Sequence, residues 1–70
     1  MNLRQLRLHF GVHVETLAKR LHITPSSVLV REAAPLRNLP LGTMFAHCEA
    51  LGGRVEMVLV SPDGTRTEIG

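Results

Sequence analysis

Apolar residues recur every three to four positions at the start of the chain, which predicts two short amphipathic helices. The first apolar stripe consists of Leu3, Leu6 and Phe10. Gly11 can close this helix, because glycine accepts the left-handed conformation of a helix cap. The second stripe predicts a helix over about residues 14–21, and its apolar side chains at positions i, i+3, i+4 and i+7 are Val14, Leu17, Ala18 and Leu21.

A third helix is predicted to begin three residues after the second one ends. The Thr24 hydroxyl can cap the free amide groups at its start, and Pro25 suits the first helical position. Pro35 prevents the helix from continuing. Two short helices joined by so tight a turn cannot lie antiparallel and must cross steeply. The pattern therefore predicts a helix-turn-helix.

A fourth helix is indicated by Met44, Cys48 and Leu51, which share helical spacing. The pair Gly52-Gly53 is a typical end for it. From Arg54 onward the apolar residues alternate with a period of two, as they do in a strand.

The end of the chain is predicted to fold as a β-hairpin. Ser61-Pro62-Asp63-Gly64 is a strong turn signal, because proline presets the first turn dihedral and glycine accepts positive φ. A second strand is then expected over residues 65–69. The first strand is apolar on both faces, so we expect a second copy to cover one face or the open edge, and the predicted dimerisation residues are Val55, Met57, Val58, Leu59 and Val60.

These elements predict a mainly α fold of four short helices with a C-terminal β-hairpin. Residues 1–53 form the helical helix-turn-helix part and residues 54–70 the hairpin. We expect the hairpin to pack on the helices as part of the same single domain, completing the core and a dimer sheet. A chain of 70 residues buries only about 60% of its unfolded surface, so a homodimer is the expected source of further stability.

Charge and cysteine content restrict the classes of function. The net charge is +2, but residues 1–35 carry five cations against two acids and residues 36–70 carry three against four. The basic N-terminal half is compatible with a nucleic-acid partner. Cys48 is the only cysteine, which fits a reducing compartment, and no apolar run resembles a signal peptide or a membrane span. We therefore expect a cytoplasmic protein without membrane contact.

No residue pattern indicates catalysis, a metal site or a cofactor. His9 and His13 lie four apart, but Gly11 intervenes and no acid or cysteine completes a ligand set. The neighbours His47 and Cys48 point about 100° apart on a helix and cannot transfer a proton to each other. We expect a binding protein that is not an enzyme.

Two stretches resemble a known family. Residues 11–28, from Gly11 to Val28, are similar to the helix-turn-helix of phage-repressor (XRE-type) regulators. Residues 41–56, with the "EALGG" element at 49–53, and the later "PDG" at 62–64 are similar to the tail of short antitoxin-like members, and this second half is the more specific part. The resemblance implies a dimeric transcriptional regulator that represses its own or a neighbouring promoter, with a cognate toxin or another protein as a further partner.

The chain departs from the family pattern on the third helix. Leu29 and Val30 stand where polar or basic residues are usual, Arg31 stands where a core aliphatic is expected, and His22 replaces the usual turn glycine. We expect phosphate contacts from Arg4, Arg7, Lys19 and Arg20. The full set of predicted DNA-binding residues is Val14, Lys19, Arg20, Thr24, Pro25, Ser26, Ser27, Val30, Arg31 and Arg37.

Two hypotheses follow from these residues. The first is a sequence-specific DNA-binding dimer. The second is a degenerate helix-turn-helix that serves as a protein-interaction or inhibitory module, with Leu29 and Val30 as its contact surface. The basic N-terminal half and the whole-chain resemblance favour the first, whereas the weakly polar third helix favours the second.

Overall fold

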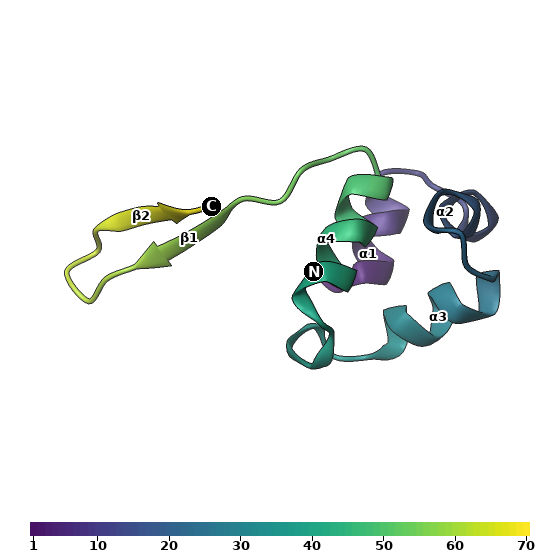
Figure 1. The fold of residues 1–70 in the computed structure, drawn as a ribbon, viewed down its shortest axis with the longest axis horizontal. Coiled ribbons are helices and arrows are strands. Elements are labelled where there is room, and N and C mark those ends of the chain that lie inside the picture. The colour runs from purple at the N-terminus through teal and green to yellow at the C-terminus, as the bar shows by residue number, and fades with distance from the viewer.

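The computed structural model describes residues 1–70 as a cluster of short helices with a hairpin that extends to one side (Figure 1). The chain measures 43 × 22 × 19 Å along its principal axes. The predicted fold class of four helices and a C-terminal hairpin is confirmed. In chain order the elements are α1 (Leu3–His9), α2 (Val14–Leu21), α3 (Pro25–Ala33), a 3₁₀ turn (Leu36–Asn38), α4 (Leu41–Ala50), β1 (Met57–Val60) and β2 (Arg66–Ile69).

Local signals set most of the helix ends. Asn2 and Gln5 form a capping box on α1, in which each side-chain oxygen accepts the other residue's backbone N–H at 2.8 Å. Gly11 and Gly52 adopt positive φ just after α1 and α4, as the sequence predicted. None of the helices, which are seven to ten residues long, has the length and apolar character needed to cross a bilayer.

The hydrophobic core lies where α2, α3 and α4 meet. Its buried residues are Leu17 and Ala18 of α2, Val28 of α3, and Leu51 directly after α4. Half-buried side chains, among them Leu6 of α1, surround this cluster. The core therefore fixes the crossing of α2 and α3.

A buried ion pair joins α1 to α3. Arg7 Nε donates to Glu32 Oε2 at 2.8 Å, and Arg7 Nη2 donates to Glu32 Oε1 at 3.2 Å. Arg7 Nη1 also donates to the backbone oxygen of Val12 at 3.2 Å. The hydrogen bond to Glu32 raises the pKa of Arg7 above its ordinary value. Both residues are buried, so the expectation that Arg7 contacts phosphate is wrong: its guanidinium is used inside the fold.

His47 of α4 is a second polar group in the interior. Its side chain is almost completely buried, and Nε2 has no hydrogen-bond partner. Burial, assisted by the positive charge of Arg31, lowers the pKa of His47 below its ordinary value. The neutral imidazole is therefore the form that the fold accommodates.

We expect the folded state to lose stability as the pH falls through about 6.5, the ordinary pKa that His47 regains on unfolding. Because the folded-state pKa is lowered, the unfolded chain binds a proton first, and acid shifts the equilibrium toward it. Thermal unfolding followed by circular dichroism at pH 7.5 and pH 5.5 should show a lower Tm at the acid pH. His47→Leu should reduce this difference, whereas His13→Leu, at an exposed position, should leave it unchanged. An equal pH dependence in all three proteins would contradict the assignment to His47.

The hairpin has the predicted turn and a clear register. The Gly64 N–H donates to the Ser61 carbonyl at 2.9 Å, and Gly64 has φ of 89°. Asp63 Oδ1 accepts the Thr65 N–H at 2.9 Å, which lowers the pKa of Asp63. The antiparallel partners are Met57 with Ile69, Val58 with Glu68, Leu59 with Thr67, and Val60 with Arg66.

This register gives the hairpin two unlike faces. Residues directly opposite each other in an antiparallel pair lie on the same face. The face that we call the apolar hairpin face carries Met57, Leu59, Thr67 and Ile69, and the other carries Val58, Val60, Arg66 and Glu68. Met57 is half-buried, and the other seven side chains are exposed.

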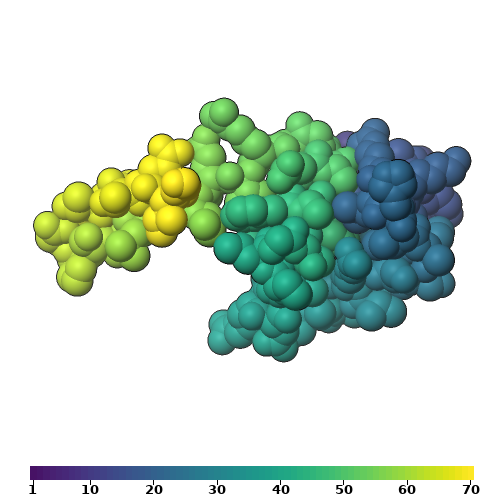
Figure 2. Space-filling model, viewed as in Figure 1, coloured from purple at the N-terminus to yellow at the C-terminus, as the bar shows by residue number.

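The hairpin does not complete the core of its own chain. We expected one face of the first strand to pack on the helices, but the core cluster contains no hairpin residue. The cluster closes with Leu51, and residues 52–56 then lead the hairpin away from the helical body, as Figure 2 shows. The first strand also begins at Met57 and not at Arg54, because Met57 already pairs with Ile69 near the end of the second strand.

Candidate nucleic-acid interface

The turn between α2 and α3 has the tight geometry that the sequence predicted. His22 adopts the left-handed conformation, with φ of 57° and ψ of 40°, and it is the only residue other than glycine with positive φ. The Ile23 N–H then reaches back to the Ala18 carbonyl at 3.0 Å, which closes the end of α2. His22 thus takes the left-handed conformation at the position where the resemblance noted in the sequence implied a glycine.

The first turn of α3 is fixed by its own cap. Thr24 Oγ1 accepts the Ser27 N–H at 3.1 Å, and the two hydroxyl oxygens lie 2.9 Å apart. The Ser27 side chain is therefore half-buried and held by Thr24, whereas Ser26 is exposed and free. Of the two serines that were expected to lead into DNA, Ser26 is the one that faces solvent.

The side chains of α3 divide into an inner and an outer set. Val28 and Glu32 point inward, Val28 to the core and Glu32 to Arg7. Arg31 is half-buried and its charge acts on His47. The exposed set, which we call the outer face of α3, consists of Pro25, Ser26, Leu29, Val30 and Ala33. This face contains one hydroxyl and no charge, and Val30 is 72% exposed on it.

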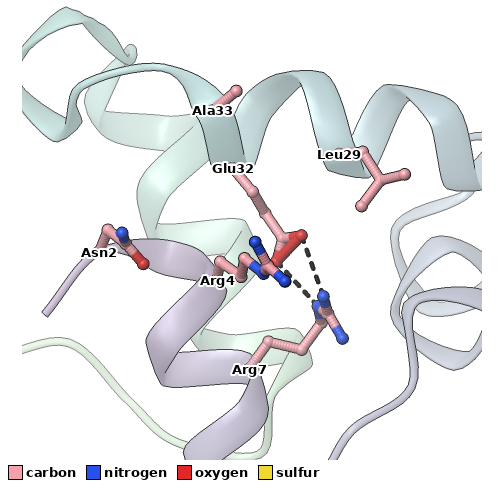
Figure 3. A pocket seen from close by; sticks show the side chains of 6 residues that line it. All are labelled: Asn2, Arg4, Arg7, Leu29, Glu32 and Ala33. Carbon is pink, nitrogen blue, oxygen red and sulfur yellow. Dashed lines mark hydrogen bonds and ion pairs between the residues drawn. The ribbon is translucent and has the colours of Figure 1, made fainter.

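A groove of about 490 Å³ runs along one flank of this outer face (Figure 3). Leu29 and Ala33 line it from α3, and Asn2 and Arg4 line it from the start of α1. Arg7 and Glu32, which form the buried ion pair, also line this groove. Arg4 is exposed, so the groove places one free guanidinium beside the outer face.

The other predicted contact residues have different surroundings. Lys19 and Arg37 are exposed, on α2 and on the 3₁₀ turn that follows α3. Arg20 is also exposed, but its Nη1 donates to the Ala50 carbonyl at the end of α4 at 2.7 Å. Val14 is half-buried and packs against the core. Of these four side chains, only Lys19 and Arg37 are both charged and free.

A second, apolar groove of about 330 Å³ lies at the root of the hairpin. Leu6 of α1, Phe10 directly after α1, Cys48 of α4, and Val55 of the connecting segment contribute to its wall. Burial raises the pKa of the Cys48 thiol. No three His, Cys, Asp or Glu side chains of the chain come together as a metal site would require.

Solved structures share this arrangement over the whole chain. One is a HigA antitoxin whose structure is described as showing induced DNA bending by a unique dimerization. It matches with a TM-score of 0.90 and 25% identity, over 97% of this chain and 90% of that chain. The chain has the fold of a HigA antitoxin. The DNA-bound antitoxin HigA3 has the same fold, with a TM-score of 0.89 and 24% identity over 100% of this chain and 90% of that one.

Comparison by sequence is less informative than comparison by structure. No protein-family model matches the chain, and no curated protein sequence is similar to it. Membership of the XRE-type family therefore stays a prediction. The HigA-like fold agrees with the antitoxin-like resemblance of the second half of the chain.

Sequence reasoning missed two features of this candidate site. The pairing of Arg7 with Glu32 was missed because 25 positions separate the two residues. Arg4 was named as a phosphate contact, but its place in a groove that Leu29 also lines depends on how α1 packs against α3. The one available signal was Glu32, an acid at the spacing of the inner face, four positions after Val28.

Proposed function

We propose that this chain is a DNA-binding transcriptional regulator of the antitoxin type that acts as a homodimer. The observation that carries the proposal is the outer face of α3: the core and the Arg7–Glu32 pair hold α3 firmly, yet one side of it is left open to solvent. A recognition helix needs both properties, because its exposed side must enter the major groove in a fixed orientation.

Charge supports the same proposal. Arg4, Lys19 and Arg37 are exposed and make no ion pair, so they are available for phosphate contacts. The first turn of α3 adds backbone N–H groups at the positive end of the helix dipole. The HigA antitoxins of the same fold are described as DNA-bound and as bending DNA, which is the activity that we propose here.

The homodimer is proposed to form through the hairpin. Leu59 and Ile69 are exposed on the apolar hairpin face, and an isolated two-stranded hairpin is marginal in water. A second copy would cover this face. The dimer would then hold its two α3 helices so that they enter successive major grooves. The HigA antitoxin that matches with a TM-score of 0.90 is likewise described as dimerizing. The proposal also includes two roles for the dimer: it represses the chain's own or a neighbouring promoter, and it binds a cognate toxin.

A protein-interaction module is the second candidate function. It is favoured by Leu29 and Val30, two exposed aliphatic side chains on the outer face of α3. In that case α3 would contact a protein partner and not DNA. The two candidates differ in whether the chain binds the DNA upstream of its own coding region.

We expect the wild-type chain to bind this upstream duplex in preference to a scrambled one, and Ser26→Tyr to abolish the preference. A tyrosine at the free, exposed Ser26 position would hold α3 out of the groove. Fluorescence anisotropy with both duplexes at low salt measures the effect. Ala46→Tyr, at an exposed position of α4, is the matched control and should bind as the wild type does. No binding by the wild type would favour the interaction module, whereas undiminished preference in Ser26→Tyr would contradict α3 as the element that reads the DNA.

A further inference from the structure

The outer face of α3 lacks the side chains that usually read bases. Arginine, asparagine and glutamine form paired hydrogen bonds with guanine or adenine edges. The outer face carries none of these residues, and Ser26 supplies its only side-chain hydrogen-bonding group.

Apart from Ser26, the polar residues of α3 are engaged or turned inward. Glu32 binds Arg7, and Thr24 and Ser27 bind each other. Arg31 is half-buried near His47. What remains outward besides Pro25 and Ser26 is aliphatic: Leu29 and Val30 are adjacent in the sequence, and Ala33 follows about one turn later.

The major groove offers one apolar feature to such a surface, the C5-methyl group of thymine. We propose that α3 recognises its DNA site through contacts of Leu29 and Val30 with thymine methyl groups. This inference rests on the proposed DNA-binding function and specifies the chemistry that the DNA must present: thymine, or another pyrimidine with a C5-methyl group.

The surroundings of the aliphatic side chains favour DNA over a protein as the molecule that contacts them. Arg4 lines the same groove as Leu29 and Ala33, so a cation outside any ion pair shares this groove with the aliphatic side chains. Lys19 and Arg37 add charge on the neighbouring elements, and the only exposed acid of α2 and α3 is Glu15. An aliphatic strip with flanking cations matches a groove floor of methyl groups between two phosphate backbones.

Replacing thymine by deoxyuridine removes the methyl group and leaves base pairing intact. Burial of one methyl group corresponds to about a fourfold change in affinity. A dimer that contacts one methyl group in each half-site should therefore bind a uracil-substituted site about 15-fold more weakly.

The experiment compares the upstream duplex made with thymine against the same duplex made with deoxyuridine, by fluorescence anisotropy. The wild type should lose about 15-fold in affinity. In the double variant Leu29→Ser/Val30→Ser the loss should nearly disappear, because the contacting side chains are gone. Both residues are exposed, so the fold should persist, which circular dichroism checks. The double variant separates a direct methyl contact from a change in the shape of the DNA.

A third duplex tests whether a C5-methyl group on a base other than thymine is sufficient for the contact. This duplex carries 5-methylcytosine in place of cytosine at positions of the site where cytosine does not prevent binding. The wild type should bind it more tightly than the unmethylated duplex, whereas the double variant should bind both equally. Equal wild-type affinity for the thymine and uracil duplexes overturns the methyl-reading proposal while leaving DNA binding intact. An equal uracil penalty in the wild type and in Leu29→Ser/Val30→Ser also overturns it. Failure of the wild type to bind the thymine duplex at all contradicts the proposed function itself.

Discussion

Replacing Arg7 by alanine should unfold most of the chain at 37 °C. The substitution leaves the Glu32 carboxylate buried without its partner, and breaking a buried pair in this way costs about 3–5 kcal/mol of unfolding free energy. A domain of this size has little stability in reserve. Thermal unfolding by circular dichroism should show a Tm lower by about 15 °C or more.

Two further variants separate the ion pair from a general effect of lost charge. Arg4→Ala removes an exposed arginine from the same helix and should change the unfolding free energy by less than about 0.5 kcal/mol. Arg7→Met/Glu32→Leu replaces the pair by apolar groups of similar volume and should recover most of the stability lost in Arg7→Ala. A Tm for Arg7→Ala close to that of Arg4→Ala would show that the pair does not hold α1 against α3.

Leu59→Glu should convert the proposed homodimer into a monomer. The substitution places a carboxylate at the centre of the apolar hairpin face. Burial of a leucine contributes about 2 kcal/mol, and two-fold symmetry applies the loss twice, so the dimer dissociation constant should rise about a thousandfold. Sedimentation equilibrium or light scattering at micromolar concentration measures the change, and affinity for the upstream duplex should fall with it.

The adjacent position supplies a matched control. Val60→Glu introduces the same charge on the opposite hairpin face, where it stands across from Arg66. Val60 and Leu59 are exposed to similar extents, 54% and 59%, so the two variants differ mainly in the face that they alter. The sequence predicted Val60 as one of the dimerisation residues, but the register puts it on the face opposite to Leu59, so we expect Val60→Glu to remain dimeric. A wild type that is monomeric at these concentrations, or two variants that dissociate equally, would contradict an interface on the apolar hairpin face.

The order of the elements and most of the helix ends could be predicted because their signals are local. The bounds Val14–Leu21 agree with the apolar stripe, and α3 starts at Pro25 after a Thr24 cap as expected. The turn at Ser61–Gly64 also forms as predicted. Each of these features depends on residues within four or five positions, which interact in the same way in almost any fold.

The candidate site could be predicted only in part. The sequence predicted α3 as the recognition element and Ser26 and Val30 as members of its surface, and the structure leaves both side chains exposed. It could not separate Ser26 from Ser27, since the hydrogen bond between Thr24 and Ser27 depends on the cap geometry.

The amino-acid sequence by itself determined which segments form helices and strands, because capping, periodicity and turn chemistry act over a few residues. Only the tertiary structure decided that Arg7 is part of the interior and Arg4 is free, since the packing of α1 on α3 brings Arg7 to Glu32. It also decided that the hairpin stands away from the helices. Leu51 already completes the core cluster, so the apolar hairpin face packs against no core residue of its own chain. Both outcomes depend on contacts between distant residues, which local pattern does not encode.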